Sequence, residues 1–115
     1  MEDLRTRTRT YANRIIKLYV ALPKTTEAQV IGKQILRSGT SVGAHYREGS
    51  RARSVAEFKS KLGGAQQELE ETAYWLELLG DNEIVPRERL EDLENETDEL
   101  ARILTTCIKN ASAKD

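Results

Sequence analysis

Residues that build cross-links, metal sites and catalytic centres are scarce in this chain. It contains one cysteine, one histidine and one tryptophan among 115 residues. The single cysteine, Cys107, cannot form an internal disulfide, and the single histidine, His45, cannot form a cluster of histidine ligands within one chain. We therefore expect no disulfide framework, no metal and no cofactor.

Long apolar runs are missing as well. No purely apolar stretch exceeds a few residues, so none could cross a bilayer. Two acidic residues follow Met1 where a secretory signal would have its apolar core, which favours a cytoplasmic protein. Hydrophobic residues make up 38% and charged residues 32% of the chain, as in a soluble and very polar helical protein. Its length corresponds to one domain, residues 1–115, for which oligomer formation would add buried surface.

No set of residues typical of catalysis is present. Acid–base catalysis commonly uses a histidine or a shielded carboxylate, and nucleophilic catalysis needs an activated side chain with a partner base. Cys107 falls on an apolar seam, where a thiol behaves as a small hydrophobe. His45 has Glu48 one turn further on, and we expect it to be an interface or polar packing residue. The chain is therefore predicted not to be an enzyme.

Apolar residues recur at spacings of three and four along most of the chain, and no stretch alternates as a strand would. This pattern predicts four helices, at about residues 3–21, 27–48, 55–79 and 86–111. Pro23 ends the first helix, Gly49 follows the second, and a capping box from Ser54 to Glu57 opens the third. Because the connections are short, consecutive helices should be antiparallel neighbours. The predicted fold is all-α, an up-down-up-down four-helix bundle.

The charges divide unevenly between the two halves of the chain. Residues 1–61 carry 13 Lys and Arg against 5 Asp and Glu, while residues 62–115 carry 5 against 14. The formal net charge of −1 therefore hides a polarised molecule. Such asymmetry indicates charged partners, or packing of the two halves on each other.

The second predicted helix carries a basic track on the face opposite its apolar stripe. The track consists of Lys33, Arg37, Arg47 and Arg51, and Arg53 extends it towards the third helix. Basic residues near the start of the first helix can add to it: Arg5, Arg7 and Arg9. Such a track suits a phosphate backbone, because cationic side chains displace condensed counterions and gain affinity without reading the base sequence.

Two functions remain open for this track. In the first, it binds RNA or single-stranded nucleic acid nonspecifically. In the second, carboxylates of the third and fourth helices or of a protein partner neutralise the arginines. The chain would then be a protein-interaction module with an acidic or reverse-transcriptase-like partner and no nucleic-acid binding.

A row of small residues lies about a quarter turn from the apolar stripe of the second helix. Three glycines in this row cost roughly 1 kcal/mol each relative to alanine, which indicates the close approach of another backbone. That backbone can belong to this chain or to a neighbouring subunit. Aromatic residues off the seam of the third helix favour the subunit. The predicted oligomer interface consists of Gly32, Leu36, Gly39, Gly43, Tyr46, Tyr74 and Trp75.

Three segments, residues 34–49 (QILRSGTSVGAHYREG), 54–58 (SVAEF) and 68–79 (ELEETAYWLELL), resemble a known family. This is the four-helix bundle family of proteins encoded in 23S ribosomal RNA intervening sequences, which is mostly of unknown function. It is related to the accessory variability determinant of diversity-generating retroelements, a barrel-shaped homopentamer that binds nucleic acid and a reverse transcriptase. The resemblance implies a ring-like homo-oligomer, a pentamer, without enzyme activity.

This chain departs from the family pattern at two points. His45 stands where the family usually has asparagine. The estimated pI of 5.9 is far from that of the basic accessory determinant. Nucleic-acid binding would therefore depend on a local basic surface that is separated from the acidic one, rather than on the total charge.

Overall fold

The computed structural model describes residues 3–113, which form four α-helices and no strand. The helices are α1 (Leu4–Ala21), α2 (Thr26–Ser50), α3 (Val55–Asp81) and α4 (Arg87–Ala113). The prediction of four helices in an all-α fold is confirmed. Each helix begins and ends within two residues of the range expected from the apolar spacing.

Capping side chains set the helix starts. Asp3, Thr25 and Ser54 each accept a hydrogen bond from the backbone N–H three residues further on. The cap of α2 is thus Thr25, which leaves the following threonine inside the helix. At α3 the carboxylate of Glu57 accepts a 2.7 Å bond from the backbone N–H of Arg53, which ties down the residue before the cap. These bonds satisfy donors that a helix N-terminus otherwise leaves unpaired.

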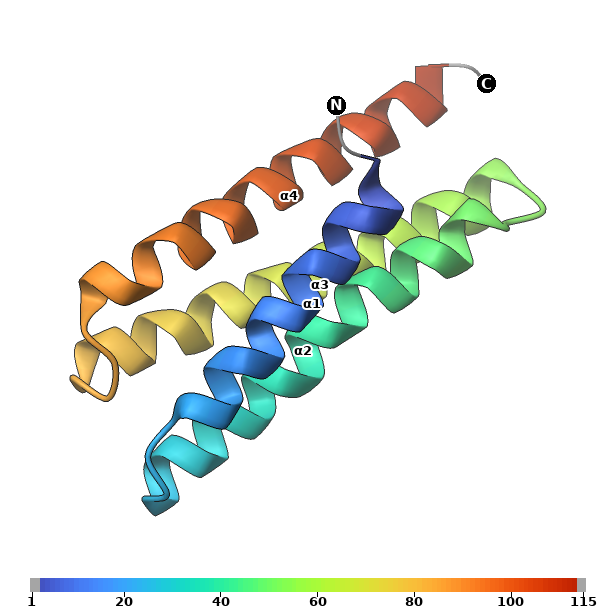
Figure 1. The fold of residues 1–115 in the computed structure, drawn as a ribbon. Coiled ribbons are helices and arrows are strands. Elements are labelled where there is room, and N and C mark those ends of the chain that lie inside the picture. Colours follow the sequence, from blue (N-terminus) through green and yellow to red (C-terminus); the bar gives the residue numbers. More distant parts are fainter. Residues whose placement is uncertain (1–2, 114–115) are drawn as a thin grey trace.

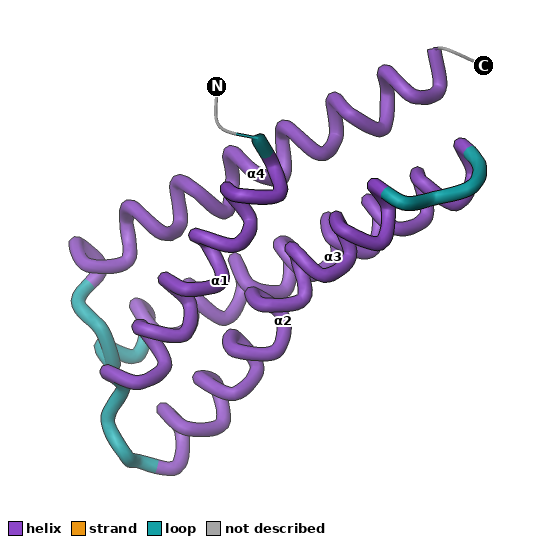
Figure 2. The backbone as a smooth tube through the Cα atoms, turned by 45° about the vertical axis from the view of Figure 1, so that its right-hand side comes forward, coloured by secondary structure: helices purple, strands orange, loops and turns teal. Residues whose placement is uncertain are grey.

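Consecutive helices run antiparallel and form an elongated bundle of 49 × 21 × 20 Å (Figures 1 and 2). α2 packs against α1 on one side and against α3 on the other, and α4 packs against α3. α1 and α4 meet over a short stretch only. The α1–α2 and α3–α4 connections lie at one end of the bundle, and the α2–α3 connection lies at the other.

The core contains the apolar residues that recur at spacings of three and four in α3 and α4. Its largest fully buried apolar side chains are Tyr11, Ile15, Ile35, Val42, Leu62, Leu69, Leu76, Leu79, Leu90, Leu100 and Leu104. Buried hydroxyls are paired across helices. Tyr11 bonds Thr97 at 2.6 Å between α1 and α4, and Ser38 bonds Thr72 at 2.7 Å between α2 and α3. Within residues 3–113 no helix combines the length and apolarity that crossing a membrane requires.

Candidate nucleic-acid interface

The glycine row of α2 is filled by α1 of the same chain. Gly32, Gly39 and Gly43 are buried. A Cβ atom on Gly39 would lie 2.7 Å from the side chain of Ile15, and one on Gly32 would lie 2.6 Å from that of Leu22. The intrachain alternative therefore accounts for these glycines. Side chains from α1 and from Leu22 just after it occupy the space above them, and a subunit contact at these glycines stays a prediction.

The other residues predicted for that interface differ in exposure. Leu36, Tyr46 and Trp75 are half-buried against the core, and burial raises the pKa of Tyr46. Tyr74 is 54% exposed, and its ring meets that of Trp75 edge-on with centroids 5.1 Å apart. A contact between subunits at these residues stays a prediction.

The five residues of the predicted basic track do not share one surface. Arg37 turns towards α3, where its Nη2 lies 2.8 Å from Oε1 of Glu71 and its Nη1 lies 3.6 Å from Oε2 of Glu68. This pairing offsets the charge of Arg37, whose side chain is still 55% exposed, and its part in the track stays a prediction. The other members have no ion-pair partner among residues 3–113: Lys33, Arg47, Arg51 and Arg53.

Arg47 lines a groove between α1 and α2 together with two arginines of α1. Arg5 and Arg9 stand one helical turn apart on the wall formed by α1, and the groove encloses a cavity of about 450 Å³. Small side chains form the rest of the lining: Thr8, Ala12, Thr40, Gly43 and Ala44. Arg5 and Arg9 also lack an ion-pair partner within the described part of the chain. We call this site the basic groove.

The donors of the basic groove are guanidinium groups. The hydroxyl of Thr8 donates a 2.7 Å hydrogen bond to the carbonyl of Leu4, and that of Thr40 donates one of 2.7 Å to the carbonyl of Leu36. These protons are therefore not available to a ligand. Among residues 3–113 no aromatic side chain lines the groove. The groove can hold an anion by charge, but it offers neither side-chain amides for base edges nor a ring for stacking.

The third arginine near the start of α1 points elsewhere. Arg7 donates two 2.8 Å hydrogen bonds to the carboxylate of Glu96 and lies 3.0 Å from Glu99 on α4. Hydrogen bonding to Glu96, and then to Glu99, raises the pKa of Arg7. Helical periodicity separates the three arginines, because positions 5 and 9 share a face while position 7 lies on nearly the opposite side. This spacing is the signal that could have selected Arg5 and Arg9 from the sequence.

His45 lies between two carboxylates at the α2–α3 contact. Its Nε2 is 3.7 Å from Oε2 of Glu68, and its Nδ1 is 4.0 Å from Oε1 of Glu48. The ring covers Gly64, where a Cβ would approach Nδ1 to 3.1 Å. Within residues 3–113 no group of three histidine, cysteine or acidic side chains is arranged to hold a metal ion.

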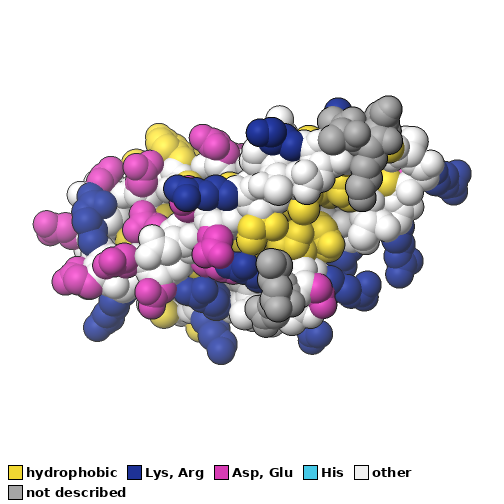
Figure 3. All heavy atoms as spheres, turned by 90° about the horizontal axis from the view of Figure 1, so that it is seen from above, with side chains coloured by type: hydrophobic (Ala, Val, Ile, Leu, Met, Phe, Trp, Pro, Cys, Tyr) yellow, Lys and Arg dark blue, Asp and Glu magenta, His cyan; other side chains and the backbone are white. Residues whose placement is uncertain are grey.

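Within the described part of the chain no carboxylate lines the basic groove. Residues 68–99 hold 13 acidic residues and 2 arginines. They lie on the C-terminal part of α3, on the N-terminal part of α4 and, for Glu83, on the connection between them, at the end opposite the α2–α3 connection. Figure 3 shows most acidic side chains of the visible face over one half, interspersed with several Lys and Arg, whereas the charged side chains of the other half are mostly Lys and Arg. The acidic side chains of this face therefore concentrate towards one end of the bundle.

Comparison with known proteins identifies the family. No curated protein matches the chain. The sequence profile of the 23S rRNA-intervening sequence protein family matches residues 3–106. The crystal structure of a protein of unknown function from the S23 ribosomal protein family of Bacteroides thetaiotaomicron is 42% identical, with a TM-score of 0.88 over 93% of this chain and 99% of that chain. The chain thus belongs to the family of 23S rRNA-intervening sequence proteins, as the three sequence segments predicted.

Proposed function

We propose that the protein is a non-catalytic homo-oligomeric scaffold, a pentamer, that binds RNA or single-stranded nucleic acid nonspecifically through the basic groove. The observation that carries the nucleic-acid part is the arrangement of Arg5, Arg9 and Arg47 around one groove without carboxylate partners among residues 3–113. A phosphate backbone that contacts them releases condensed counterions, which favours binding.

The lining of the basic groove supports binding without sequence preference. Reading a base edge needs directed donors and acceptors, and binding single strands tightly usually needs aromatic stacking. The threonine hydroxyls are engaged with backbone carbonyls and no aromatic side chain is present, so the contacts go to phosphates. The names of the matched family and of the similar structure both refer to the ribosome or its RNA, which supports RNA as the polyanion.

The test is a fluorescence-anisotropy titration of a labelled oligouridine at several salt concentrations. Three phosphate contacts to a single strand predict a slope of about −2 in a plot of log affinity against log salt. Replacing Arg9 or Arg47 with alanine should reduce that slope by about 0.7 in each case. Oligoadenine should bind with the same slope.

A matched variant controls for the loss of one positive charge. Arg102 is exposed on α4, is paired with Asp98 at 3.1 Å, and does not line the basic groove. Arg102→Ala should leave the slope unchanged. If it weakens binding as much as Arg47→Ala does, the groove is not the interface.

Self-association is supported by apolar side chains that the bundle leaves exposed. Ile16 and Val20, one turn apart on α1, are 41% and 68% exposed, and Val30 on α2 is 58% exposed. Exposed apolar patches often mark contacts with other molecules. Sedimentation velocity should find an assembly for the wild type and a smaller species for Ile16→Ser with Val20→Ser. A wild type that sediments as a monomer at micromolar concentration contradicts this part and leaves the RNA titration unaffected.

The alternative function is a protein-interaction module in which the basic groove docks an acidic segment, such as one on a reverse-transcriptase-like partner, and binds no nucleic acid. Its support is the small lining of the groove, where Ala12 and Ala44 leave room for side chains of a docked helix. A glutamate-rich helical peptide that binds the groove where oligouridine does not would establish this alternative in place of the first.

A further inference from the structure

Tyr74 stands on α3 between two carboxylates. Glu70 precedes it by four residues and Glu77 follows it by three, so all three side chains project from one face of the helix. A shallow cavity of about 430 Å³ lies over these residues. Within residues 3–113 neither Glu70 nor Glu77 has an ion-pair partner, whereas the neighbouring Glu71 is paired with Arg37.

This arrangement matches the chemistry of a cationic side chain. The face of an aromatic ring attracts a guanidinium or ammonium group, and a carboxylate beside the ring can accept its hydrogen bonds. The half-buried Trp75 holds the ring of Tyr74 edge-on, at 60° between the ring planes. Unpaired carboxylates on both sides repel phosphate, so this surface does not suit the nucleic acid proposed for the basic groove.

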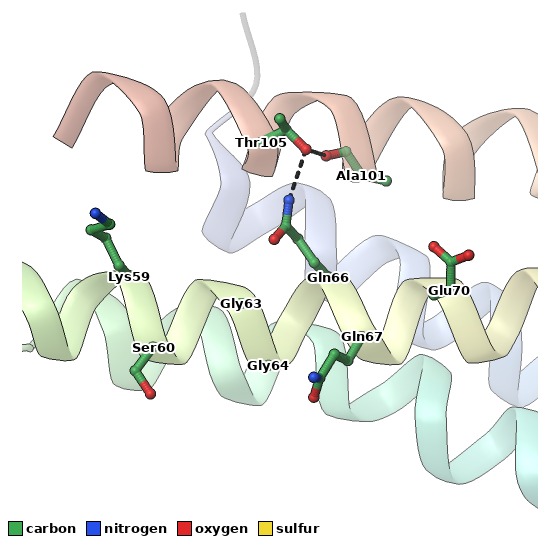
Figure 4. A pocket seen from close by; sticks show the side chains of 9 residues that line it. All are labelled: Lys59, Ser60, Gly63, Gly64, Gln66, Gln67, Glu70, Ala101 and Thr105. Carbon is green, nitrogen blue, oxygen red and sulfur yellow. Dashed lines mark hydrogen bonds between the residues drawn. The ribbon is translucent and has the colours of Figure 1, made fainter. Parts of the chain in front are cut away.

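A second cavity adjoins the first and shares Glu70 with it. It has a volume of about 700 Å³ and lies along α3 from Lys59 to Glu70, with Ala101 and Thr105 of α4 on its other side. Figure 4 shows Lys59 and Glu70 rising on the side of α4, with Gln66 between them. The amide of Gln66 donates a 2.7 Å hydrogen bond to Oγ1 of Thr105 across this cavity.

Gly63 lines this second cavity. Within the described structure no neighbouring atom lies close enough to require a glycine at this position. A Cβ on Gly63 would meet nothing within 4 Å, whereas a Cβ on each of the other glycines would meet an atom at 3.1 Å or less. A glycine in the middle of a helix lowers stability, so an open one indicates that something outside the chain comes close. Ser60 and Gln67 also line this cavity, and Figure 4 shows their hydroxyl and amide on the side of α3 that points away from α4.

The two cavities form one long surface, which we call the α3 outer face: the side of α3 that carries Ser60, Gly63, Gln67, Glu70, Tyr74 and Glu77. From Ser60 to Glu77 it extends about 26 Å along the helix. A small cation would cover only the part around Tyr74. The length, the open glycine and the unpaired carboxylates together fit a positively charged polypeptide.

We propose that the α3 outer face binds a basic segment of another protein, with an arginine side chain over Tyr74 between Glu70 and Glu77 and the segment's backbone over Gly63. This site goes beyond the proposed function, because it lies on a different helix from the basic groove and selects the opposite charge.

The test uses Trp75 as a reporter, since it is the single tryptophan of the chain and touches Tyr74. Titration with an octa-arginine peptide at physiological salt should change the tryptophan fluorescence saturably. Tyr74→Ala should weaken binding roughly fivefold, the size of an exposed cation–π contact, and Tyr74→Phe should restore it. Gly63→Leu should also weaken binding, because its side chain fills the space left for the backbone.

A charge-matched pair of variants separates a local site from the overall charge. Glu70→Gln with Glu77→Gln should weaken the peptide by about tenfold, as expected for two charge-assisted hydrogen bonds. Glu88→Gln with Glu91→Gln removes the same charge from exposed positions of α4 and should leave the affinity within about twofold. Equal losses in the two double variants would overturn the proposal.

Two further outcomes also decide against the proposal. If free arginine binds as tightly as the octa-arginine peptide when both are compared at equal guanidinium concentration, the surface is a small-cation site rather than a polypeptide site. If Tyr74→Ala converts an assembled wild type into monomers, the occupant is a second copy of this chain. Tyr74→Ala should bind oligouridine as tightly as the wild type does. Loss of peptide binding therefore tests the α3 outer face, and loss of oligouridine binding tests the basic groove.

Discussion

Alanine should stabilise the protein at Gly63 but not at Gly39. At Gly39, a Cβ would lie 2.7 to 3.0 Å from three side-chain atoms of the fully buried Ile15, so alanine overpacks the α1–α2 contact. Overpacking typically costs about 1 to 3 kcal/mol, and the gain in helix propensity returns about 1 kcal/mol. At Gly63 the propensity gain of about 1 kcal/mol stands alone, because the Cβ meets no atom.

Urea unfolding followed by circular dichroism measures both effects. Gly63→Ala should raise the free energy of unfolding by about 1 kcal/mol. Gly39→Ala should unfold at lower urea than Gly63→Ala, with a difference of about 1 to 3 kcal/mol between the two variants at unchanged m-values. If the two variants shift the midpoint equally, α1 does not fill the glycine row as described. A repeat at several protein concentrations separates this effect from self-association.

Three other perturbations test the contacts between helices. Arg7→Ala should lower the free energy of unfolding, measured in urea, by about 1 to 3 kcal/mol, because it leaves the half-buried Glu96 of α4 without its partner. The surface variant Arg102→Ala should lower it by less than about 0.5 kcal/mol. Burial raises the pKa of Tyr11 to about 12. An unfolded tyrosine ionises near pH 10. The free energy of unfolding should therefore be unaffected by this group below about pH 10 and fall by about 2 to 3 kcal/mol by about pH 12. Urea titrations at several pH values should show a smaller fall for Tyr11→Phe. Ser38→Ala should cost about 1 to 2 kcal/mol, and a cycle with Thr72→Val should show that the two losses do not add.

Local rules account for most of the fold. The unbroken spacing of three and four in α3 requires one face to be apolar, and Leu62, Leu69, Leu76 and Leu79 are all buried there. Capping at Ser54 depends on residues within one turn, so it could also be predicted from the sequence. Helix pairing then follows from short connections.

The candidate site was harder to predict because tertiary contacts select among side chains on the same helix. Arg37 and Arg47 both lie on the outward half of α2, yet Glu71 on α3 pairs with one of them while the other remains unpaired within residues 3–113. The glycine row of α2 posed the same problem. Its spacing allows the close approach of any helix, whether this is α1 of the same chain or a helix of a neighbouring subunit. Only the packing of Ile15 distinguishes these two arrangements.

The limited contact between α1 and α4 has a consequence for motion. α2 and α3 share the largest interface, while the terminal helices rest mainly on one neighbour each. Local opening has the lowest free energy where the fewest contacts are lost. In native-state hydrogen exchange, amides of the α2–α3 hairpin should therefore be protected longest and those of the terminal helices should exchange first. Release of α1 in such an opening would uncover the glycine face of α2, so this transient state provides a route for one copy to lend its first helix to another.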